Sequence, residues 1–384
     1  MRRVKFIFRN LLNIPQMMIK GITNSKQNRE DCCFSFYEQQ FKRYIHENQF
    51  NDKELPGEAE YVKKWSQLDH RVEPYSFRFY SNYMTNPLLI IPEAIGHLRI
   101  EECINNQNHV EFYSDKNCYD IYLQDIHRPR TLLRRCGDNF LLDASYNIIS
   151  DITHTTSIGC LIKEEGIKEA IFKPSIDSDS GVGVIKLIKN TDGDWIKPDG
   201  NGFTVSDMSK YKHFIIQECI QQSSYISRFC KTAVNTMRIC MYKSVVTGEW
   251  KMTASVLRIA KDGKCVDNAH AGGITVRIEP DNGRLGNHLY DSHGRKLYQW
   301  NGIDFSKSEH TIPNWNKVKE FAYRIAMKYV GFRLIAFDIC LDKDDMPVLI
   351  ETNVKGFAYW LPQLFDFDVF DGEHEQLIKY CKDK

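Results

Sequence analysis

LIAFDICLDKDDMPVLIETN, residues 334–353, reads as a β-hairpin in which two apolar strands flank the polar turn DKDDMP. A turn centred on the Asp-Asp pair of that segment places Asp338 directly opposite Glu351, with Asn353 two residues further along the same face. Carboxylates that face each other across strands repel, and burying them uncompensated is costly. A divalent cation removes the repulsion, and oxygen ligands suit Mg²⁺ bridging ATP phosphates. The hairpin therefore predicts a metal site.

The metal prediction depends on the register of this hairpin, because side chains alternate between the two faces of a strand. A turn centred one residue away would move Glu351 to the other face, away from Asp338. The alternative interpretation is a strand face exposed to solvent that carries unrelated polar residues. The metal interpretation is favoured because Glu351 and Asn353 both lie at the end of the second strand.

A second hairpin is predicted over residues 171–190, IFKPSIDSDSGVGVIKLIKN. Gly181 and Gly183 allow its tip to fold over a triphosphate and to offer backbone N–H groups. Lys173 lies on the strand leading in, where an ammonium group would meet a phosphate oxygen, and Ser175 follows it. No Gly-Lys-Ser/Thr follows and the next element reads as a strand, which argues against a Walker loop or a Rossmann turn. An ordinary flexible hairpin with a solvated lysine is the alternative.

The overall charge is nearly balanced, with 51 lysines and arginines against 50 aspartates and glutamates in 384 residues, which argues against a general nucleic-acid binder. None of the twelve cysteines forms a Cys-x-x-Cys pair, and neither they nor the twelve histidines cluster as a zinc site requires. Scattered cysteines of this kind are typical of free buried thiols in a reducing compartment. We expect a cytoplasmic protein without a nucleic-acid partner.

The first 22 residues, MRRVKFIFRNLLNIPQMMIKGI, are basic and apolar, so a signal peptide has to be considered. Arg9, Asn10, Asn13 and Pro15 interrupt the apolar stretch, and no small-residue cleavage site follows. A helix that docks on the protein's own core is the favoured interpretation. Peripheral contact with an anionic membrane surface, at the inner face of the membrane, is the alternative.

Strands and helices are intermixed along the chain, and many neighbouring strands could pair as hairpins. This pattern favours an α+β fold over a doubly wound parallel sheet. We expect three parts. Residues 1–84 form a mostly helical N-terminal region, residues 85–213 a lead-in segment and small lobe with the glycine loop, and residues 214–384 a C-terminal lobe with the metal and acceptor sites.

Several motifs occur in the order and spacing of the ATP-grasp superfamily. They are FKPS with SGVGV, IIQECI, VNTMRI, DNAHAGGI, and AFDIC with VLIETN. More narrowly, the sequence resembles the sugar-transfer-associated branch and the related teichuronopeptide-biosynthesis-like branch, which the upstream IPE and SDKNCYDIYL also fit. The likeness covers residues 85–365 and implies an ATP-grasp fold, in which two α+β lobes sandwich ATP. The loop SIDSDSGVGV departs from the family in having fewer glycines than many family loops.

The resemblance implies a role for each matching position. Contacts with ATP phosphates are implied for Lys116, Lys173, Ser175, Gly181 and Gly183. A backbone hinge against adenine is implied for Gln217, Glu218, Cys219 and Ile220. Mg²⁺ ligands are implied at Asp338, Glu351 and Asn353. The acceptor side would be lined by Asn235, Thr236, Arg258, Asn268, Gly272 and Gly273, and Arg238 would be the catalytic residue facing the γ-phosphate and the intermediate.

Each of these residues also has a purely structural interpretation. Lys116 could be a lysine at a helix start, Glu218 could cap a strand end, and Arg238 could pair with a surface acid. Gly272 and Gly273 could make only a tight turn.

These implications point to an ATP- and Mg²⁺-dependent ligase that joins a carboxylate to an amine through an acyl phosphate. By family association, the carboxylate belongs to a small molecule or a sugar-linked group, such as a uronic acid or an amino acid, in the synthesis of capsule-like cell-surface polysaccharides. Two alternatives stay open: a kinase that phosphorylates a hydroxyl, and a non-catalytic nucleotide-binding scaffold. The sequence identifies neither substrate, nor the oligomeric state.

Overall fold

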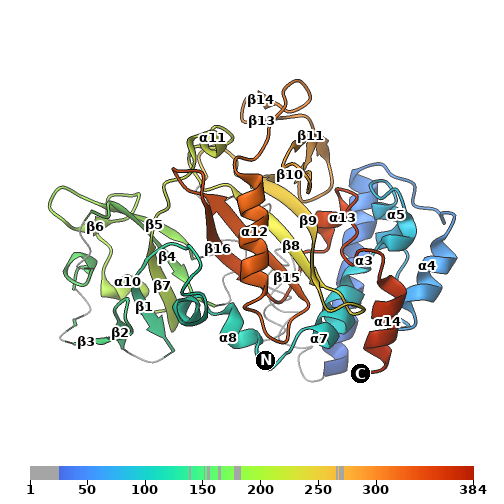
Figure 1. The fold of residues 1–384 in the computed structure, drawn as a ribbon, viewed down its shortest axis with the longest axis horizontal. Coiled ribbons are helices and arrows are strands. Elements are labelled where there is room, and N and C mark those ends of the chain that lie inside the picture. The colour runs from blue at the N-terminus through green and yellow to red at the C-terminus, as the bar shows by residue number, and fades with distance from the viewer. Residues whose placement is uncertain are drawn as a thin grey trace.

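The computed structural model describes residues 26–137, 140–150, 152–153, 156–162, 166–176, 183–264, 267 and 272–384. Figure 1 shows three parts side by side: a sheet lobe at one end, a central sheet backed by α12, and a group of helices at the other end. Every strand pair among the described residues is antiparallel. The predicted α+β class is confirmed. Within the same described residues, no helix has the length and apolar character needed to span a membrane.

The group of helices comes mainly from the start of the chain, with the last helix packed among them. Its elements are α3 (Lys26–Glu47), α4 (Glu58–Trp65), α5 (Tyr75–Tyr80), η1 (Pro87–Leu89), α6 (Glu93–Ile95), η2 (Gly96–Ile100), α7 (Glu101–Ile104), α13 (Trp360–Gln363) and α14 (His374–Lys382). Large aromatic side chains fill their core, and the buried Trp65 indole donates to the Ile90 carbonyl at 2.9 Å. We call this group the helical region.

The sheet lobe is a seven-stranded sheet with the order β3-β2-β1-β7-β4-β5-β6. Its strands are β1 (Thr131–Cys136), β2 (Leu141–Leu142), β3 (Ile148–Ile149), β4 (Glu169–Pro174), β5 (Ile185–Lys189), β6 (Trp195–Ile196) and β7 (His213–Glu218), with η4 (Ile158–Cys160) and α10 (Val205–Met208) in the same lobe. Phe172, Trp195 and Phe214 belong to its separate core. The predicted hairpin over residues 171–190 corresponds to β4 and β5, which pair directly. We call this part the small lobe.

The central sheet also has seven strands, in the order β12-β11-β10-β9-β8-β15-β16. They are β8 (Thr236–Lys243), β9 (Trp250–Ile259), β10 (Ile274–Ile278), β11 (Leu285–Tyr290), β12 (Lys296–Leu297), β15 (Leu334–Leu341) and β16 (Pro347–Asn353). The pair β13 (Gln299–Trp300) and β14 (Ile303–Asp304) stands apart, and α11 (Ser224–Ser227) and α12 (Trp315–Ala326) accompany the sheet. Before it in the chain come α8 (Val110–Ser114), η3 (Lys116–Cys118) and α9 (Tyr119–Tyr122).

The two faces of the central sheet are covered differently. One face packs on α12 through apolar side chains such as Ile239, Phe337 and Ile339. The other face packs on the helical region through residues such as Cys240, Tyr242 and Ala336. Further along this second face, the same strands carry charged side chains instead of apolar ones. The candidate site therefore begins where the cover of the helical region ends.

Candidate active site

Three charged residues form a row across neighbouring strands of the central sheet. Arg238 on β8 pairs directly with Asp338 on β15, and Asp338 pairs with Glu351 on β16. Directly paired residues project from the same face of a sheet. The prediction that Asp338 lies opposite Glu351 is confirmed.

The pairing of Asp338 with Glu351 depends on an irregularity in the β15–β16 hairpin. The turn is centred on Asp344, so a regular hairpin would pair Asp338 with Ile350. A β-bulge next to Asp338 adds one residue to β16 and restores the pair with Glu351. The predicted turn centre, between Asp344 and its neighbour, was therefore wrong by half a residue, and the bulge compensates for the difference.

Asp338 is the most enclosed carboxylate of the row, with 2% of its surface exposed. It accepts hydrogen bonds from Arg238 Nε at 2.5 Å and Nη2 at 3.1 Å, and Arg258 Nη2 lies 3.0 Å away. Burial alone would raise the pKa of Asp338, but these two guanidinium groups and a hydrogen bond from Asn353 hold it below its usual value. Asp338 is therefore a buried anion with two cationic partners.

Arg258 on β9 extends the charged row to a second buried carboxylate. Its guanidinium donates to Thr236 Oγ1 at 2.6 Å and lies 3.3 Å from Asp267. Thr236 donates its backbone N–H to Asp267 at 2.8 Å and its hydroxyl to the same oxygen at 2.5 Å. Burial raises the pKa of Asp267, against the opposing effect of Arg258. Arg258 thus links the two buried acids, Asp267 and Asp338.

Lys116 approaches the row from the segment that precedes the small lobe. The side chain of Asp115 caps the short helix η3, and Lys116 follows at its first position. The buried Lys116 ammonium lies 2.7 Å from Glu351, whose side chain is 32% exposed. The Lys116 N–H donates to the Ser175 carbonyl at 3.0 Å, and Asn117 donates to the Ser175 hydroxyl at 2.9 Å. This segment therefore joins β4 of the small lobe to β16 of the central sheet.

Lys173 on β4 is buried, with 9% of its surface exposed. Burial and the neighbouring Lys116 ammonium lower the pKa of Lys173 to about 8, against the opposing effects of Glu351 and Asp338. No carboxylate of the described residues lies within ion-pair distance of it. Lys173 is therefore a buried cation near the charged row that has no carboxylate partner among the described residues.

The oxygen atoms expected to hold Mg²⁺ come from two carboxylates and one amide. Asn353 touches Asp338 through its side chain, and Glu351 is the direct neighbour of Asp338 across the strands. Such a set fits a hard cation that keeps water or phosphate oxygens in its remaining positions. The described residues contain no cluster of three or more His, Cys, Asp or Glu side chains that could hold a metal, and the Mg²⁺ site stays a prediction.

The predicted adenine hinge lies at the end of β7, next to β1 and β4. The N–H of Glu218 donates to the Arg130 carbonyl at 3.0 Å, and the N–H of Cys219 donates to the Glu169 carbonyl at 3.0 Å. The Glu218 carboxylate accepts from Arg130 Nε at 2.8 Å, and Gln217 donates to the Pro129 carbonyl at 3.3 Å. Two hinge N–H groups, those of Glu218 and Cys219, are thus used for backbone hydrogen bonds, and the adenine contact of this segment stays a prediction.

The other predicted residues are placed as follows. Asn235 is buried, and its amide bonds to the backbone carbonyls of Ile226 and Cys230 and to the N–H of Ala260, so its substrate contact stays a prediction. Gly183 and Gly272 both have positive φ, +82° and +87°, and Gly273 is buried next to β10. Gly181 and Asn268 lie outside the described residues.

One site residue was not predicted. Asp267 is the first residue of the motif DNAHAGGI, yet the prediction assigned only later positions of that motif. Its partners Thr236 and Arg258 lie on β8 and β9, so its role becomes visible only when three chain segments come together. An acidic residue that begins a glycine-bearing motif was the available signal.

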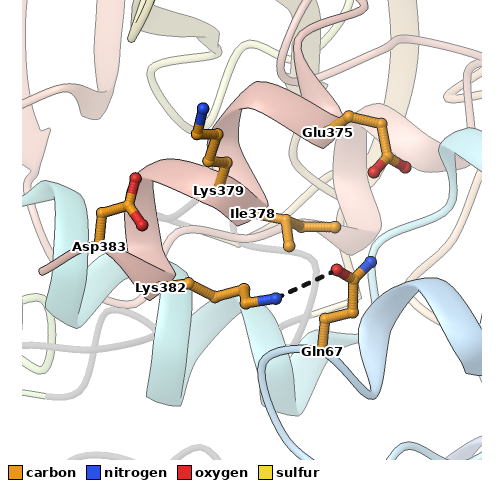
Figure 2. Close-up of a pocket in the computed structure, with 6 residues that line it drawn as sticks. All are labelled: Gln67, Glu375, Ile378, Lys379, Lys382 and Asp383. Atoms are coloured by element: carbon orange, nitrogen blue, oxygen red, sulfur yellow. Dashed lines mark hydrogen bonds between the residues drawn. The ribbon is translucent and has the colours of Figure 1, made fainter.

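A separate open pocket lies on the helical region, where α14 faces the end of α4 (Figure 2). It is lined by Gln67, Glu375, Ile378, Lys379, Lys382 and Asp383. Lys382 Nζ donates to Gln67 Oε1 at 3.5 Å. Surface side chains of one helix make up most of this lining, and none of the predicted site residues belongs to it.

The row of charges, the hairpin register and the paired small lobe agree with a match of residues 99–375 to the family described as sugar-transfer associated ATP-grasp. The chain belongs to this family. In this member, the Lys116 ammonium is in contact with Glu351 of the central sheet, and Lys173 of the small lobe is close enough for both groups to affect its pKa.

Several solved structures resemble this ATP-grasp chain. The L-amino acid ligase from Bacillus licheniformis is 11% identical over 65% of this chain and 42% of that chain, with a TM-score of 0.35. The N5-carboxyaminoimidazole synthase from Aspergillus clavatus, in complex with ADP, is 9% identical over 65% and 47%, with a TM-score of 0.36. The D-cycloserine synthetase DcsG is 10% identical over 71% and 73%, with a TM-score of 0.37.

The ATP-grasp chain spans about half the length of the first two of these structures. At such low identity and TM-score, these similarities carry no inference about substrates. No curated protein matches the sequence.

Proposed function

We propose that this ATP-grasp protein is an ATP- and Mg²⁺-dependent ligase that joins a carboxylate to an amine, with release of ADP and phosphate. The family membership supports the use of ATP. Lys173 is the observation that carries the proposal: a buried ammonium with a pKa lowered to about 8 and no carboxylate partner among the described residues. Burying an unpaired cation is costly, so such a group is favoured where an anionic ligand completes it. A nucleotide phosphate fits this position.

The two lysines divide the proposed nucleotide contacts. Lys173, on the small lobe, would bind a phosphate oxygen directly. Lys116 would exchange Glu351 for a phosphate, because Glu351 is only partly enclosed and can turn toward a cation. Asp338, Glu351 and Asn353 would hold Mg²⁺, which when bound supplies neutralisation of phosphate charge.

The proposed reaction has two steps. A carboxylate oxygen of the substrate attacks the γ-phosphorus, the bond to the ADP oxygen breaks, and an acyl phosphate forms. The amine nitrogen then attacks the acyl carbon, inorganic phosphate leaves with the bonding electrons, and the nitrogen loses a proton. Arg238 would stabilise the negative charge in both transition states. Asp338 stays paired when Arg238 turns to the substrate, because Arg258 remains 3.0 Å away.

The family description supports a substrate linked to a sugar, and we propose a uronic acid or amino-acid carboxylate used in cell-surface polysaccharide synthesis. Arg258, Thr236, Gly272 and Gly273 would line the acceptor side. The proposed location is the cytoplasm. The possible contact of residues 1–22 with the inner face of the membrane falls outside the described residues.

The reaction class is tested by an ADP-release screen that crosses candidate carboxylates with candidate amines. A ligase is expected to release ADP only when both partners are present. With ¹⁸O in the substrate carboxylate, a ligase transfers label into inorganic phosphate. A kinase releases no labelled phosphate, and AMP in place of ADP would point to adenylation and contradict the acyl-phosphate route.

A further inference from the structure

One helix of the helical region reaches the β15–β16 hairpin. The elements α6, η2 and α7 follow one another without a break from Glu93 to Ile104, and η2 is a π-helical turn. Such turns widen a helix locally and recur at functional sites. Glu93, His97 and Glu101 are spaced at four-residue intervals and lie on one side of this helix, where His97 contacts both acids.

Asn105, directly after this helix, binds both strands of the hairpin. Its Oδ1 accepts from the N–H groups of Arg333 and Leu334, at 2.9 and 3.0 Å. Its Nδ2 donates to the carbonyls of Leu334 and Val354, at 2.8 and 3.0 Å. Asn105 is 3% exposed, so water does not compete for these bonds. One side chain thus fixes the start of β15 against the residue that follows Asn353.

Glu101 holds the next part of the chain. Its two carboxylate oxygens accept the N–H groups of Gly356 and Phe357, at 2.7 and 3.1 Å. His97 Nδ1 lies 2.7 Å from the same carboxylate, and the flanking acids raise the pKa of His97 to about 10 against the effect of burial. His97 is therefore protonated at neutral pH and donates to Glu101, which keeps both Glu101 oxygens as acceptors for the loop.

The helix and the loop also fit each other closely in shape. A Cβ atom at Gly96 would lie 2.4 Å from the Tyr359 ring, and the Tyr359 hydroxyl donates to the Gly96 carbonyl at 3.2 Å. On the other side of the hairpin, Tyr119 accepts the Thr352 N–H at 3.0 Å. The residues from Thr352 to Tyr359 are thus held at successive points. Asn353 lies within this stretch, and Glu351 lies directly before it.

We infer that Glu101, in α7 of the helical region, and Asn105, directly after α7, are positioning residues. They touch no proposed ligand and fix the end of β16 that carries the proposed Mg²⁺ ligands. The inference rests on the proposed function, since it takes Glu351 and Asn353 as Mg²⁺ ligands. Residues that orient a metal ligand through hydrogen bonds control metal affinity as well as stability. Loss of the Glu101 contacts would let the loop and Asn353 move, and so would weaken Mg²⁺-dependent nucleotide binding.

The test compares Glu101→Gln with Glu73→Gln. Glu73 is also buried in the helical region and also accepts two backbone N–H groups, but these come from Tyr75 and Ser76, next to it in the chain, and not from the hairpin or the loop that follows it. Glutamine keeps one acceptor oxygen. Glu101 uses a separate oxygen for each loop N–H, so Glu101→Gln loses one of the two bonds. Both N–H groups at Glu73 share one oxygen, so Glu73→Gln removes a buried carboxylate and keeps an acceptor for both bonds. Binding of the non-hydrolysable analogue β,γ-imido ATP is measured calorimetrically at increasing Mg²⁺. Glu101→Gln is expected to raise the Mg²⁺ midpoint about tenfold or more, while Glu73→Gln keeps the wild-type midpoint.

Equal midpoints for Glu101→Gln and the wild type would overturn the inference, even if both variants lose thermal stability. Wild-type binding that does not depend on Mg²⁺ would overturn the proposed metal site and the inference together. If Glu101→Gln does not fold, hydrogen exchange on the wild type decides. The amides of Gly356 and Phe357 are expected to gain protection when β,γ-imido ATP and Mg²⁺ bind, because coupling between sites is reciprocal. Unchanged exchange at both amides would contradict the positioning role.

Discussion

Lys116 and Lys173 approach the same site, and their environments give them different electrostatic properties. Lys116 has a carboxylate partner at 2.7 Å, and Lys173 has none among the described residues. Burial is the largest effect on both, yet the pKa of Lys116 is raised through Glu351 whereas that of Lys173 is lowered to about 8. The unpaired lysine is therefore the one that destabilises the ligand-free protein.

Lys173→Met is expected to stabilise the ligand-free protein at pH 7 and to weaken ATP binding. The folded pKa of about 8 lies below the ordinary value of 10.5, so the unfolded chain binds more protons between these two values. Wild-type stability therefore rises with pH across that window. The free energy of unfolding of the variant should exceed that of the wild type by on the order of 3 kcal/mol at pH 7. This difference should disappear above the ordinary lysine pKa. Urea unfolding at pH 7, 8.5 and 10 measures it.

Lys186→Met is the matched control, because Lys186 on β5 is one-third exposed and pairs with Glu169 at 2.9 Å. Its effect should stay within about 0.5 kcal/mol at each pH. A Lys173→Met variant that is less stable than the wild type at pH 7 would show that the buried charge of the lysine does not destabilise the ligand-free protein.

Arg238→Ala is expected to lower kcat by about 100-fold or more while the KM for ATP changes little. Arg238 faces Asp338 at the centre of the row, and Arg258 keeps that carboxylate paired when Arg238 is absent. Steady-state kinetics of ADP release, with the substrates that the screen identifies, separates the two constants. Arg238→Lys, which keeps a cation, should recover part of kcat. An unchanged kcat at saturating ATP would exclude Arg238 as the catalytic residue.

At the scale of elements, the hairpin β4–β5 combines the strand that carries the buried Lys173 with a closely packed glycine. Gly183 has a φ of +82°, and an added Cβ would lie 3.0 Å from the Tyr211 hydroxyl and 3.1 Å from Pro174. Pro174 directly follows Lys173. Any shift at Gly183 is therefore transmitted to the strand that carries the buried lysine.

Gly183→Ala is expected to weaken ATP binding and to destabilise the small lobe. Gly200→Ala isolates the backbone contribution, because Gly200 has nearly the same φ, +83°, with no atom within 4 Å of the added Cβ. Both variants carry a conformational cost of about 1–2 kcal/mol, and only Gly183→Ala adds the steric conflict. Thermal unfolding and ATP titration compare them. Equal ATP affinities would mean that the tip of β4–β5 does not contribute to the site.

The sequence predicted the elements with local patterns better than the contacts between distant segments. The carboxylate hairpin was predictable because alternating apolar residues and a polar turn specify which side chains share a face. Its bulge was not, because one extra residue leaves no marker in the sequence. The contacts of Asn105 with Leu334 and of Glu101 with Gly356 join residues more than two hundred positions apart. Only the folded chain brings such pairs together.

At the scale of the whole molecule, the site is shared by parts that have separate cores. Lys173 comes from the small lobe, Asp338 and Glu351 from the central sheet, and Glu101 from the helical region. A ligand that binds the small lobe and the central sheet at once stabilises their arrangement as well as each part.

ATP with Mg²⁺ is expected to raise the unfolding temperature more than ATP with EDTA. Ligand at 100 times its Kd adds about 2.7 kcal/mol to stability. In Asp338→Asn the Mg²⁺-dependent part of this shift should vanish, because the proposed metal site loses a charge. Asp125→Asn, which removes an exposed carboxylate that pairs with Lys328, should respond like the wild type. An equal shift with Mg²⁺ and with EDTA in the wild type would contradict the metal site.

The ion pairs of the ligand-free site have a consequence for the order of events. Glu351 is neutralised by Lys116 and Asp338 by Arg238 and Arg258, so a lone divalent ion has to compete with three of the protein's own cations. A nucleotide that arrives with its metal gives those cations phosphates in exchange for their carboxylates. We therefore expect metal and nucleotide to enter as one complex. Pre-incubation with Mg²⁺ alone should leave the association rate of ATP unchanged.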